Sequence, residues 1–369
     1  MRVVIAPDKF KGSLSAAEAA AAMGEGVLAV YPDAEVTAVP VADGGEGTLD
    51  AALLAGAEPR STRVRGPLGR EVTAVWALTG DSALIETARA SGLALLEPTP
   101  ETALSATSYG CGELIRAALD NGARTIILGI GGSAMTDGGS GALTALGLKI
   151  LDDAGTPVPP GGAGLLRAAS LDAAGLDPRL AGADLRIAAD VTNPLLGPEG
   201  TVSVFSSQKG ADAAAQAVLE EAMRNWARLL ESATGVDVDI PGAGAAGGFP
   251  SGFLALTQAS VNPGFELLSA FTGLDTALTR CDLVLTGEGS LDEQSRYGKA
   301  PLEVAVRARD AGIPVVAVAG RITLTPDQLE EYGIVAAVSL LDVAPRPQDA
   351  MDQAAKYVSW ATRRVLEGA

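Results

Sequence analysis

The stretch RVVIAPDKFKGSLS, residues 2–15, joins an apolar run, a charged loop and a helix start. The apolar run predicts a buried strand over residues 2–6. Ser15 is followed three residues later by Glu18, a capping-box pairing that fixes the start of a helix. A second apolar run over 35–39 follows that helix. The opening therefore predicts a β-α-β unit, which requires a parallel sheet.

The same alternation returns near the C-terminus. The expected elements there are a strand over 282–286, a helix over 302–311, strands over 314–318 and 334–339, and a helix over 350–366. Because both ends of the chain carry this pattern, we expect one discontinuous, Rossmann-like α/β domain with a parallel sheet. Its segments are residues 1–60 and 281–369.

The middle of the chain, residues 61–280, predicts an inserted α/β domain with a mixed sheet. Short strands over 72–76 and 82–86 are separated by Gly and Asp turns, which is typical of antiparallel pairing. Residues 105–147 have α/β alternation and fit either domain. The Gly-rich segment 237–262 is expected to be a loop. We expect the active site in the cleft between the two domains.

Composition narrows the function. A net charge of −18 opposes binding to nucleic acid or to an anionic membrane. No apolar run reaches the roughly 18 residues of a membrane span, and the first residues lack a signal-peptide pattern, so we expect a cytoplasmic protein. The chain has no His, which excludes His-based catalysis and the usual zinc sites. Acid–base chemistry is left to carboxylates, Lys, Tyr or Cys.

Five loops that follow apolar strands combine Gly with acidic, basic or hydroxyl residues. They cover residues 7–13, 43–48, 131–139, 190–194 and 287–299. Gly allows a backbone to approach a phosphate closely, and carboxylates in the same loops need a divalent cation to accept one. Each loop taken alone also fits an ordinary turn, but together they indicate a site for a magnesium nucleotide.

Lysine is rare, and its positions are informative. The six lysines are Lys9, Lys11, Lys149, Lys209, Lys299 and Lys356. Lys9, Lys11 and Lys299 fall within Gly-containing loops, where we expect them to act as point charges.

Two common nucleotide fingerprints do not apply. Lys299 follows a Gly but precedes Ala300, so no phosphate-binding loop of the G-x-x-x-x-G-K-[ST] type is present. Residues 242–247 match G-x-G-x-x-G by letters, but the strand and helix that a dinucleotide site requires are not predicted around them. A dehydrogenase therefore stays an alternative only.

Six blocks of sequence together have the order of a known family. They are residues 5–14, 42–48, 129–139, 190–195, 241–248 and 286–299. With these blocks, the chain resembles the type I, two-domain glycerate kinase family from end to end. It departs from the usual pattern at Lys9, at Met135-Thr136 and at Cys111, and none of these changes removes a carboxylate.

The resemblance implies ATP-dependent phosphorylation of D-glycerate, at the 2-hydroxyl, giving 2-phosphoglycerate and ADP. ATP and Mg²⁺ are the implied cofactors, and D-glycerate and ATP the implied partners, with no nucleic acid or membrane. A monomer or a homodimer is expected. The alternatives are an NAD-dependent dehydrogenase and a non-catalytic sugar-acid-binding protein.

The site residues follow from these blocks. Asp190, Lys11, Asp43 and Lys299 are expected to be catalytic, with Asp190 as the base or a magnesium partner. Expected nucleotide contacts are Gly131, Gly132, Ser133, Asp137, Gly287 and Glu288. Expected glycerate contacts are Asp8, Ser13, Glu46 and Asn193. Expected magnesium ligands are Asp43, Asp190 and Asp292.

Overall fold

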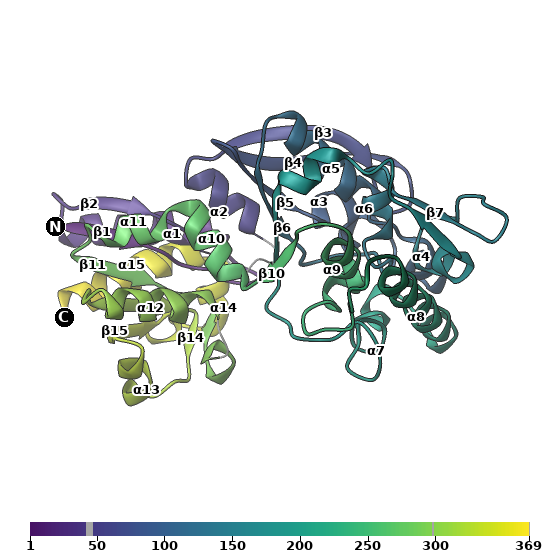
Figure 1. Ribbon diagram of the computed structural model, residues 1–369. Helices are drawn as coiled ribbons and strands as arrows, with labels where there is room; N and C mark the ends of the chain where they lie inside the picture. The colour runs from purple at the N-terminus through teal and green to yellow at the C-terminus, as the bar shows by residue number, and fades with distance from the viewer. Residues whose placement is uncertain (42–46, 297–298, 369) are drawn as a thin grey trace. The chain divides into compact units, whose positions relative to one another are not determined.

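The chain folds into two compact units in the computed structural model, which describes residues 1–41, 47–296 and 299–368. Unit 1 comprises Met1–Asp43, Asp50–Ala57 and Phe265–Ala369, and unit 2 comprises Gly44–Leu49 and Glu58–Gly264. Unit 1 therefore contains both ends of the chain, the purple and yellow ribbons of Figure 1.

Unit 1 is built on a five-stranded parallel sheet of order β15-β13-β11-β1-β2. Its strands are β1 (Arg2–Ile5), β2 (Glu35–Ala38), β11 (Leu283–Thr286), β13 (Val315–Ala319) and β15 (Ile334–Ser339). The register places Val3 opposite both Leu283 and Val36. The expected parallel sheet assembled from the two ends of the chain is confirmed.

Alternate residues of a strand point to opposite faces of the sheet, and here both sets are apolar. Helices therefore cover both faces of this sheet. Val3 and Ile5 are buried with α1 (Ala16–Val30) and α15 (Ala354–Glu367), whereas Val4 is buried with α12 (Ala300–Asp310). Further helices of this region are α10 (Gly264–Thr272), α11 (Leu274–Leu278), α13 (Pro326–Glu331) and α14 (Pro347–Asp352). Short strands β12 (Ser290–Leu291) and β14 (Arg321–Ile322) pair beside the sheet.

Two helix boundaries of unit 1 can be compared with the sequence predictions residue by residue. Ser15 caps α1 as predicted: its hydroxyl accepts the Glu18 N–H at 3.2 Å, and the Glu18 carboxylate accepts the Ser15 N–H at 2.9 Å. The single helix expected over 350–366 is wrong. Gln353 leaves the helical conformation (φ −125°, ψ 38°) and divides it into α14 and α15.

Unit 2 contains a six-stranded mixed sheet of order β10-β9-β6-β5-β4-β3. Its strands are β3 (Glu58–Arg65), β4 (Glu71–Thr79), β5 (Ser82–Glu86), β6 (Thr125–Gly129), β9 (Asp184–Ala188) and β10 (Ser260–Asn262). The pairs β3–β4 and β4–β5 are antiparallel, and the pairs from β5 to β10 are parallel. The expected mixed sheet is confirmed, and residues 105–147 fold with it.

The core of unit 2 is packed by helices around buried aromatic side chains, among them Trp76, Trp226 and Phe253. The helices are α3 (Ala88–Ser91), α4 (Pro100–Ser105), α5 (Tyr109–Asp120), α6 (Ser140–Ala145), α7 (Thr201–Phe205), α8 (Ala213–Thr234) and α9 (Ala245–Leu256). A hairpin of β7 (Lys149–Leu151) and β8 (Ser170–Asp172) also belongs to unit 2, whereas the helix α2 (Thr48–Leu54) belongs to unit 1 from Asp50 onward.

The loop expected over 237–262 is a correction, because this segment contains α9 and β10. Ala246, Gly247 and Gly248 turn the chain through left-handed backbone, with φ of 50°, 74° and 77°. Phe249 and Phe253, one helical turn apart, then bury their rings against one another with centroids 4.9 Å apart. The glycines made this segment resemble a loop, whereas the paired aromatics hold it in a helix.

Candidate functional site

Three loops meet at the carboxyl ends of neighbouring strands β1, β11 and β13 in unit 1. The Asp8 N–H donates to the Gly287 carbonyl at 2.9 Å, and the Arg321 N–H donates to the Gly289 carbonyl at 3.1 Å. A Cβ atom on Gly289 would lie 3.2 Å from the backbone nitrogen of Lys11, so the loop 287–296 and the loop 7–14 are in close contact. We call residues 7–14, 287–296 with Lys299, and 320–322 the unit 1 loop cluster.

Glu288 is the buried acidic group of this cluster, with 6% of its surface exposed. Its Oε1 accepts the Ser295 hydroxyl at 2.7 Å, and its Oε2 lies 3.2 Å from Lys299 Nζ. Burial raises the pKa of the Glu288 carboxyl, and the contacts with Ser295 and Lys299 oppose that rise. Lys299 also occupies the N-cap of α12, so its backbone and its ammonium are both fixed.

Asp292 is a more exposed carboxylate in the same loop. It accepts the Ser290 hydroxyl and the Gln294 N–H, each at 2.9 Å, and the Ser290 bond is the main cause of its lowered pKa. Asp292 is therefore a carboxylate at neutral pH, held in place by its own loop.

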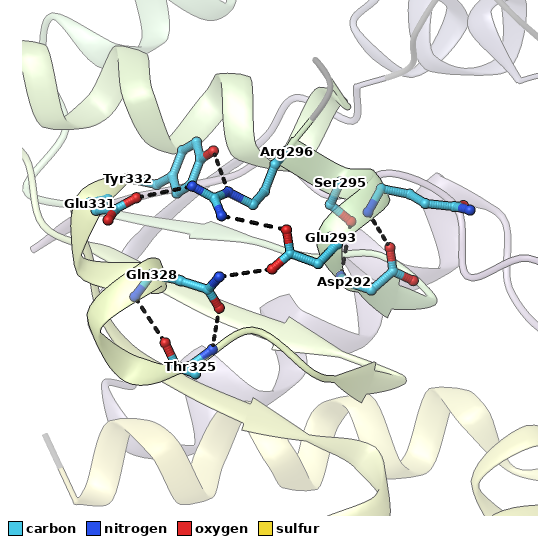
Figure 2. Close-up of polar contacts among 9 residues, drawn as sticks. Asp292, Glu293, Ser295, Arg296, Thr325, Gln328, Glu331 and Tyr332 are labelled. Carbon is cyan, nitrogen blue, oxygen red and sulfur yellow. Dashed lines mark hydrogen bonds and ion pairs between the residues drawn. The ribbon is translucent and has the colours of Figure 1, made fainter.

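The turn that carries Asp292 is braced against α13, as Figure 2 shows. Gln328 Nε2 donates to the Glu293 carboxylate at 2.8 Å, and Arg296 forms an ion pair with Glu331 at 3.3 Å. Arg296 Nε also lies 3.4 Å from the Tyr332 hydroxyl. These contacts hold residues 293–296 against α13 and the residue that follows it.

The predicted site residues of the loop 7–14 lie around Phe10, whose side chain is buried. Phe10 is 2% exposed and pairs with Leu14, which folds the loop into a tight turn. Ser13 donates to the Phe10 carbonyl at 3.0 Å, and Asp8 accepts the N–H of Lys9 at 2.6 Å. Lys11 lies in the exposed part of this turn. Two further predicted residues, Asp43 and Glu46, lie outside the described residues.

A second group of loops forms around β6 and β9, which are neighbouring parallel strands of unit 2. Gly132, with φ +68°, accepts the Leu93 N–H through its carbonyl at 2.9 Å, and Ser133 pairs with Gly92. The loop after β6 therefore rests on the segment that follows β5. Gly131, Gly132 and Ser133 form this turn, and only Gly readily adopts the backbone conformation found at position 132.

Asp137 lies at the far end of this loop and is completely buried. Its carboxylate accepts the N–H and hydroxyl of Ser108, the Thr107 hydroxyl, and the N–H groups of Gly139 and Gly141, at 2.7 to 3.3 Å. Burial raises the pKa of Asp137, and these hydrogen bonds oppose the rise. In this structure Asp137 organises the loop through its carboxylate.

Lys209 is a buried cation that the sequence reasoning missed. It is 3% exposed, and its Nζ donates to the Met135 carbonyl at 2.6 Å. Burial lowers the pKa of Lys209 to about 7, while the nearby Asp137 charge favours its protonation. The scarcity of Lys was the only available signal, because Lys209 lies outside the Gly-rich loops that we selected.

The loop 242–248 contacts both of the other loops, 190–194 and 131–139. The Asn193 carbonyl accepts the N–H groups of Gly242 and Gly244, and Gly138 donates to Gly247 at 3.0 Å. Asp190 accepts the Gly264 N–H through Oδ1 at 2.9 Å. We call residues 129–139, 190–194 and 242–248 the unit 2 loop cluster.

A further charged pair that sequence reasoning missed lies at the end of β5. Glu86 is buried, and its carboxylate accepts the Leu49 N–H and the Arg89 Nε–H, each at 2.9 Å. It therefore holds the first turn of α2, which begins at Thr48. Glu86 ends a predicted strand, and no local sequence pattern indicates its partners.

The described residues include carboxylates of the type that Mg²⁺ prefers. Asp292 lies in unit 1 and Asp190 in unit 2, and one or two carboxylates plus substrate phosphates are a usual set for this ion. Within ranges 1–41, 47–296 and 299–368, no three His, Cys, Asp or Glu side chains gather closely enough to hold a metal without other ligands. Among the described helices, none has the length and apolar character of a membrane span.

The dehydrogenase alternative finds no support in this geometry. The segment 242–247 follows α8 along the chain and contains the start of α9 at Ala245. The strand that precedes the Gly-rich turn of a dinucleotide site is therefore missing there.

Known proteins resemble this chain over its full length. A sequence model of the glycerate kinase family matches residues 3–368. Glycerate 2-kinase of Escherichia coli K12 is 43% identical, and glycerate kinase of Bacillus subtilis 168 is 42% identical; each alignment covers 99% of this chain and 97% of the relative. A crystal structure from Salmonella typhimurium LT2, provisionally named glycerate kinase 2, matches with a TM-score of 0.88 and 40% identity, covering 100% of this chain and 98% of that one.

Proposed function

Because the chain belongs to the glycerate kinase family, we propose that it transfers the γ-phosphoryl group of ATP to the 2-hydroxyl of D-glycerate. The products are then 2-phosphoglycerate and ADP. The observation that carries the proposal is the pair of loop clusters, which place Gly-rich backbone and carboxylates at strand ends, with Lys11 and Lys299 in the unit 1 loop cluster. Phosphoryl transfer depends mainly on such positioning and on neutralising charge.

The nucleotide phosphates contact the loop 131–133 in this proposal. Gly131, Gly132 and Ser133 lie on a turn whose backbone can approach an anion closely, and backbone N–H groups are good phosphate donors. Asp137 supports this loop from inside. In the unit 1 loop cluster, Gly287 and Glu288 are the residues that contact the nucleotide in this proposal.

Lys11 and Lys299 supply the positive charge that an acidic protein needs for two anionic substrates. Lys11, exposed in its turn, clamps a phosphate or the glycerate carboxylate. Lys299, held by Glu288, stabilises the charge that develops on the transferred group.

Asp190 accepts the proton of the glycerate hydroxyl. The chain has no His, so a carboxylate is the natural general base. A bound Mg²⁺ neutralises phosphate charge, and Asp43, Asp190 and Asp292 are the residues that would hold it. Asp8, Ser13, Glu46 and Asn193 orient the glycerate.

We place the protein in the cytoplasm, as a monomer or homodimer acting on small molecules. The test is an ADP-release assay with ATP, Mg²⁺ and D-glycerate, followed by NMR identification of the product. ADP release that depends on D-glycerate, with phosphorus coupled to the proton at carbon 2, supports the proposal. Binding of D-glycerate without ADP release would instead favour a non-catalytic sugar-acid-binding protein.

A further inference from the structure

We propose that Lys209 is a positioning residue for the loop 131–139, acting through the peptide between Met135 and Thr136. Lys209 lies in a short 3-10 helix, Ser207–Lys209, outside both loop clusters. Its ammonium is buried and donates to the Met135 carbonyl at 2.6 Å. The proposal rests on the proposed function, because it takes this loop to contact the nucleotide phosphates.

A buried ammonium is a costly way to fill space. An unpaired charge in a protein interior is strongly unfavourable, and an apolar side chain of similar volume is often as stable or more so. Lys209 offsets the charge of Asp137, which is itself completely buried and holds the other end of the same loop. Both buried charges therefore act on one short segment, residues 135–141, and this shared target points to the loop as the reason for the lysine.

The contact with Lys209 fixes the direction of one peptide. A trans peptide points its N–H away from its C=O, so the Thr136 N–H is directed away from Lys209 while the Met135 carbonyl is held. Without Lys209, the Met135 carbonyl keeps its packing against Gly247 but loses its hydrogen-bond donor, so the peptide turns its oxygen more readily toward an anion bound at the loop. Carbonyl oxygens repel phosphate, whereas N–H groups attract it.

The backbone around Lys209 is fixed independently of the loop that it contacts. Gly210, next to it, has φ +97°, and a Cβ atom there would lie 2.4 Å from the Thr99 nitrogen. The α7 helix that precedes it begins at Thr201, whose N–H donates to the Leu195 carbonyl at 3.1 Å. Lys209 thus connects the chain that follows loop 190–194 to loop 131–139.

The test compares Lys209→Met, Lys209→Gln and the control Lys149→Met. Lys149 is an exposed lysine of unit 2 that pairs with Asp172 at 3.2 Å. In Lys209→Met, we expect the KM for ATP to rise about tenfold or more, with the KM for D-glycerate changed less than about twofold. Lys209→Gln keeps an N–H donor and should fall between this variant and the wild type. Lys149→Met should match the wild type.

Hydrogen exchange read by mass spectrometry provides a second measurement. Exchange of the peptides covering 131–139 should increase in Lys209→Met and stay unchanged in Lys149→Met. If KM for ATP and exchange in this loop both match the wild type, the proposal is overturned. If neither Lys209 variant folds, Lys209 serves stability alone and the proposal is also overturned.

The two proposals fail in different ways. A wild-type protein that releases no ADP with D-glycerate contradicts the proposed function. The exchange measurement does not depend on turnover, so it still tests whether Lys209 holds the loop.

Discussion

The ammonium nitrogen of Lys299 lies 3.2 Å from Oε2 of Glu288, a carboxylate that is almost completely buried. Removing the ammonium leaves this acid beside Ser295 without its cation. We predict that Lys299→Met lowers kcat by a factor on the order of 10²–10³, the usual loss when a fixed charge that stabilises a transition state is removed. Steady-state kinetics with ATP and D-glycerate measure this.

The control for this variant is Lys356→Met. Lys356 lies on α15 of the same unit and donates to the exposed Gln353 side chain at 3.2 Å. Its loss should leave kcat within about twofold of the wild type, as for most surface changes. A similar kcat in both variants would remove Lys299 from the catalytic group.

The same variant should change how stability depends on pH. Burial already raises the pKa of Glu288 above its ordinary value of 4.5, and Lys299 opposes that rise. Without Lys299 the folded-state pKa rises further. A carboxyl with a raised folded pKa binds its proton more tightly in the folded chain, so stability falls as pH rises from about 4.5 through the folded pKa. Urea unfolding of Lys299→Met should show a steeper fall than the wild type over this window, and parallel curves would contradict it.

The parallel sheet of unit 1 was predictable because its signals are local. Apolar strands, a capping box at Ser15 and Glu18, and Gly-rich loops each act within a few residues, and the parallel topology then brings strand ends together. Lys299 was selected for the same reason, since a rare Lys in a Gly-containing loop is visible in the sequence.

The partners of buried charges were not predictable in this way. Lys209 and Met135 are 74 residues apart in sequence, and Glu86 and Leu49 are 37 apart. No local pattern links such pairs, because their contacts exist only after the sheet of unit 2 has formed. The helix α9 was missed for a related reason, since its buried aromatics outweigh the glycines that precede them.

Comparing Gly132→Ala with Gly122→Ala distinguishes an effect on nucleotide binding by the loop 131–133 from the general cost of a strained backbone. Both glycines have left-handed backbone, with φ of +68° and +84°. An Ala at either position should destabilise the protein by about 1–2 kcal/mol. We predict that only Gly132→Ala also raises the KM for ATP, by about tenfold, because its carbonyl and its neighbours shape the loop 131–133. Thermal unfolding and steady-state kinetics on both variants test this, and an equal KM for ATP in the two would contradict the nucleotide assignment.

Asp190 tests the assignment of the general base. Asp190→Asn keeps the size of the side chain and its ability to accept the Gly264 N–H, but removes the group that takes a proton. We predict a loss of kcat on the order of 10²–10⁴. The control is Asp184→Asn, on the strand that leads to Asp190, where the carboxylate pairs with Arg186 at the surface. A kcat for Asp190→Asn within about tenfold of the wild type would show that another group is the base.

Because Lys209 is buried, we predict that it makes the free energy of unfolding rise with pH. Burial lowers its folded-state pKa to about 7, whereas an unfolded chain keeps the ordinary lysine value of 10.5. Between these values the unfolded chain binds a proton that the folded chain has released, so the free energy of unfolding increases as pH rises. The free energy of unfolding of the wild type, minus that of Lys209→Met, should therefore increase from pH 7 to pH 10 in urea titrations. Lys149→Met, which lacks only an exposed lysine, should retain the wild-type slope. A difference between wild type and Lys209→Met that stays constant over this range would show that burial does not lower the pKa of Lys209 in the folded protein.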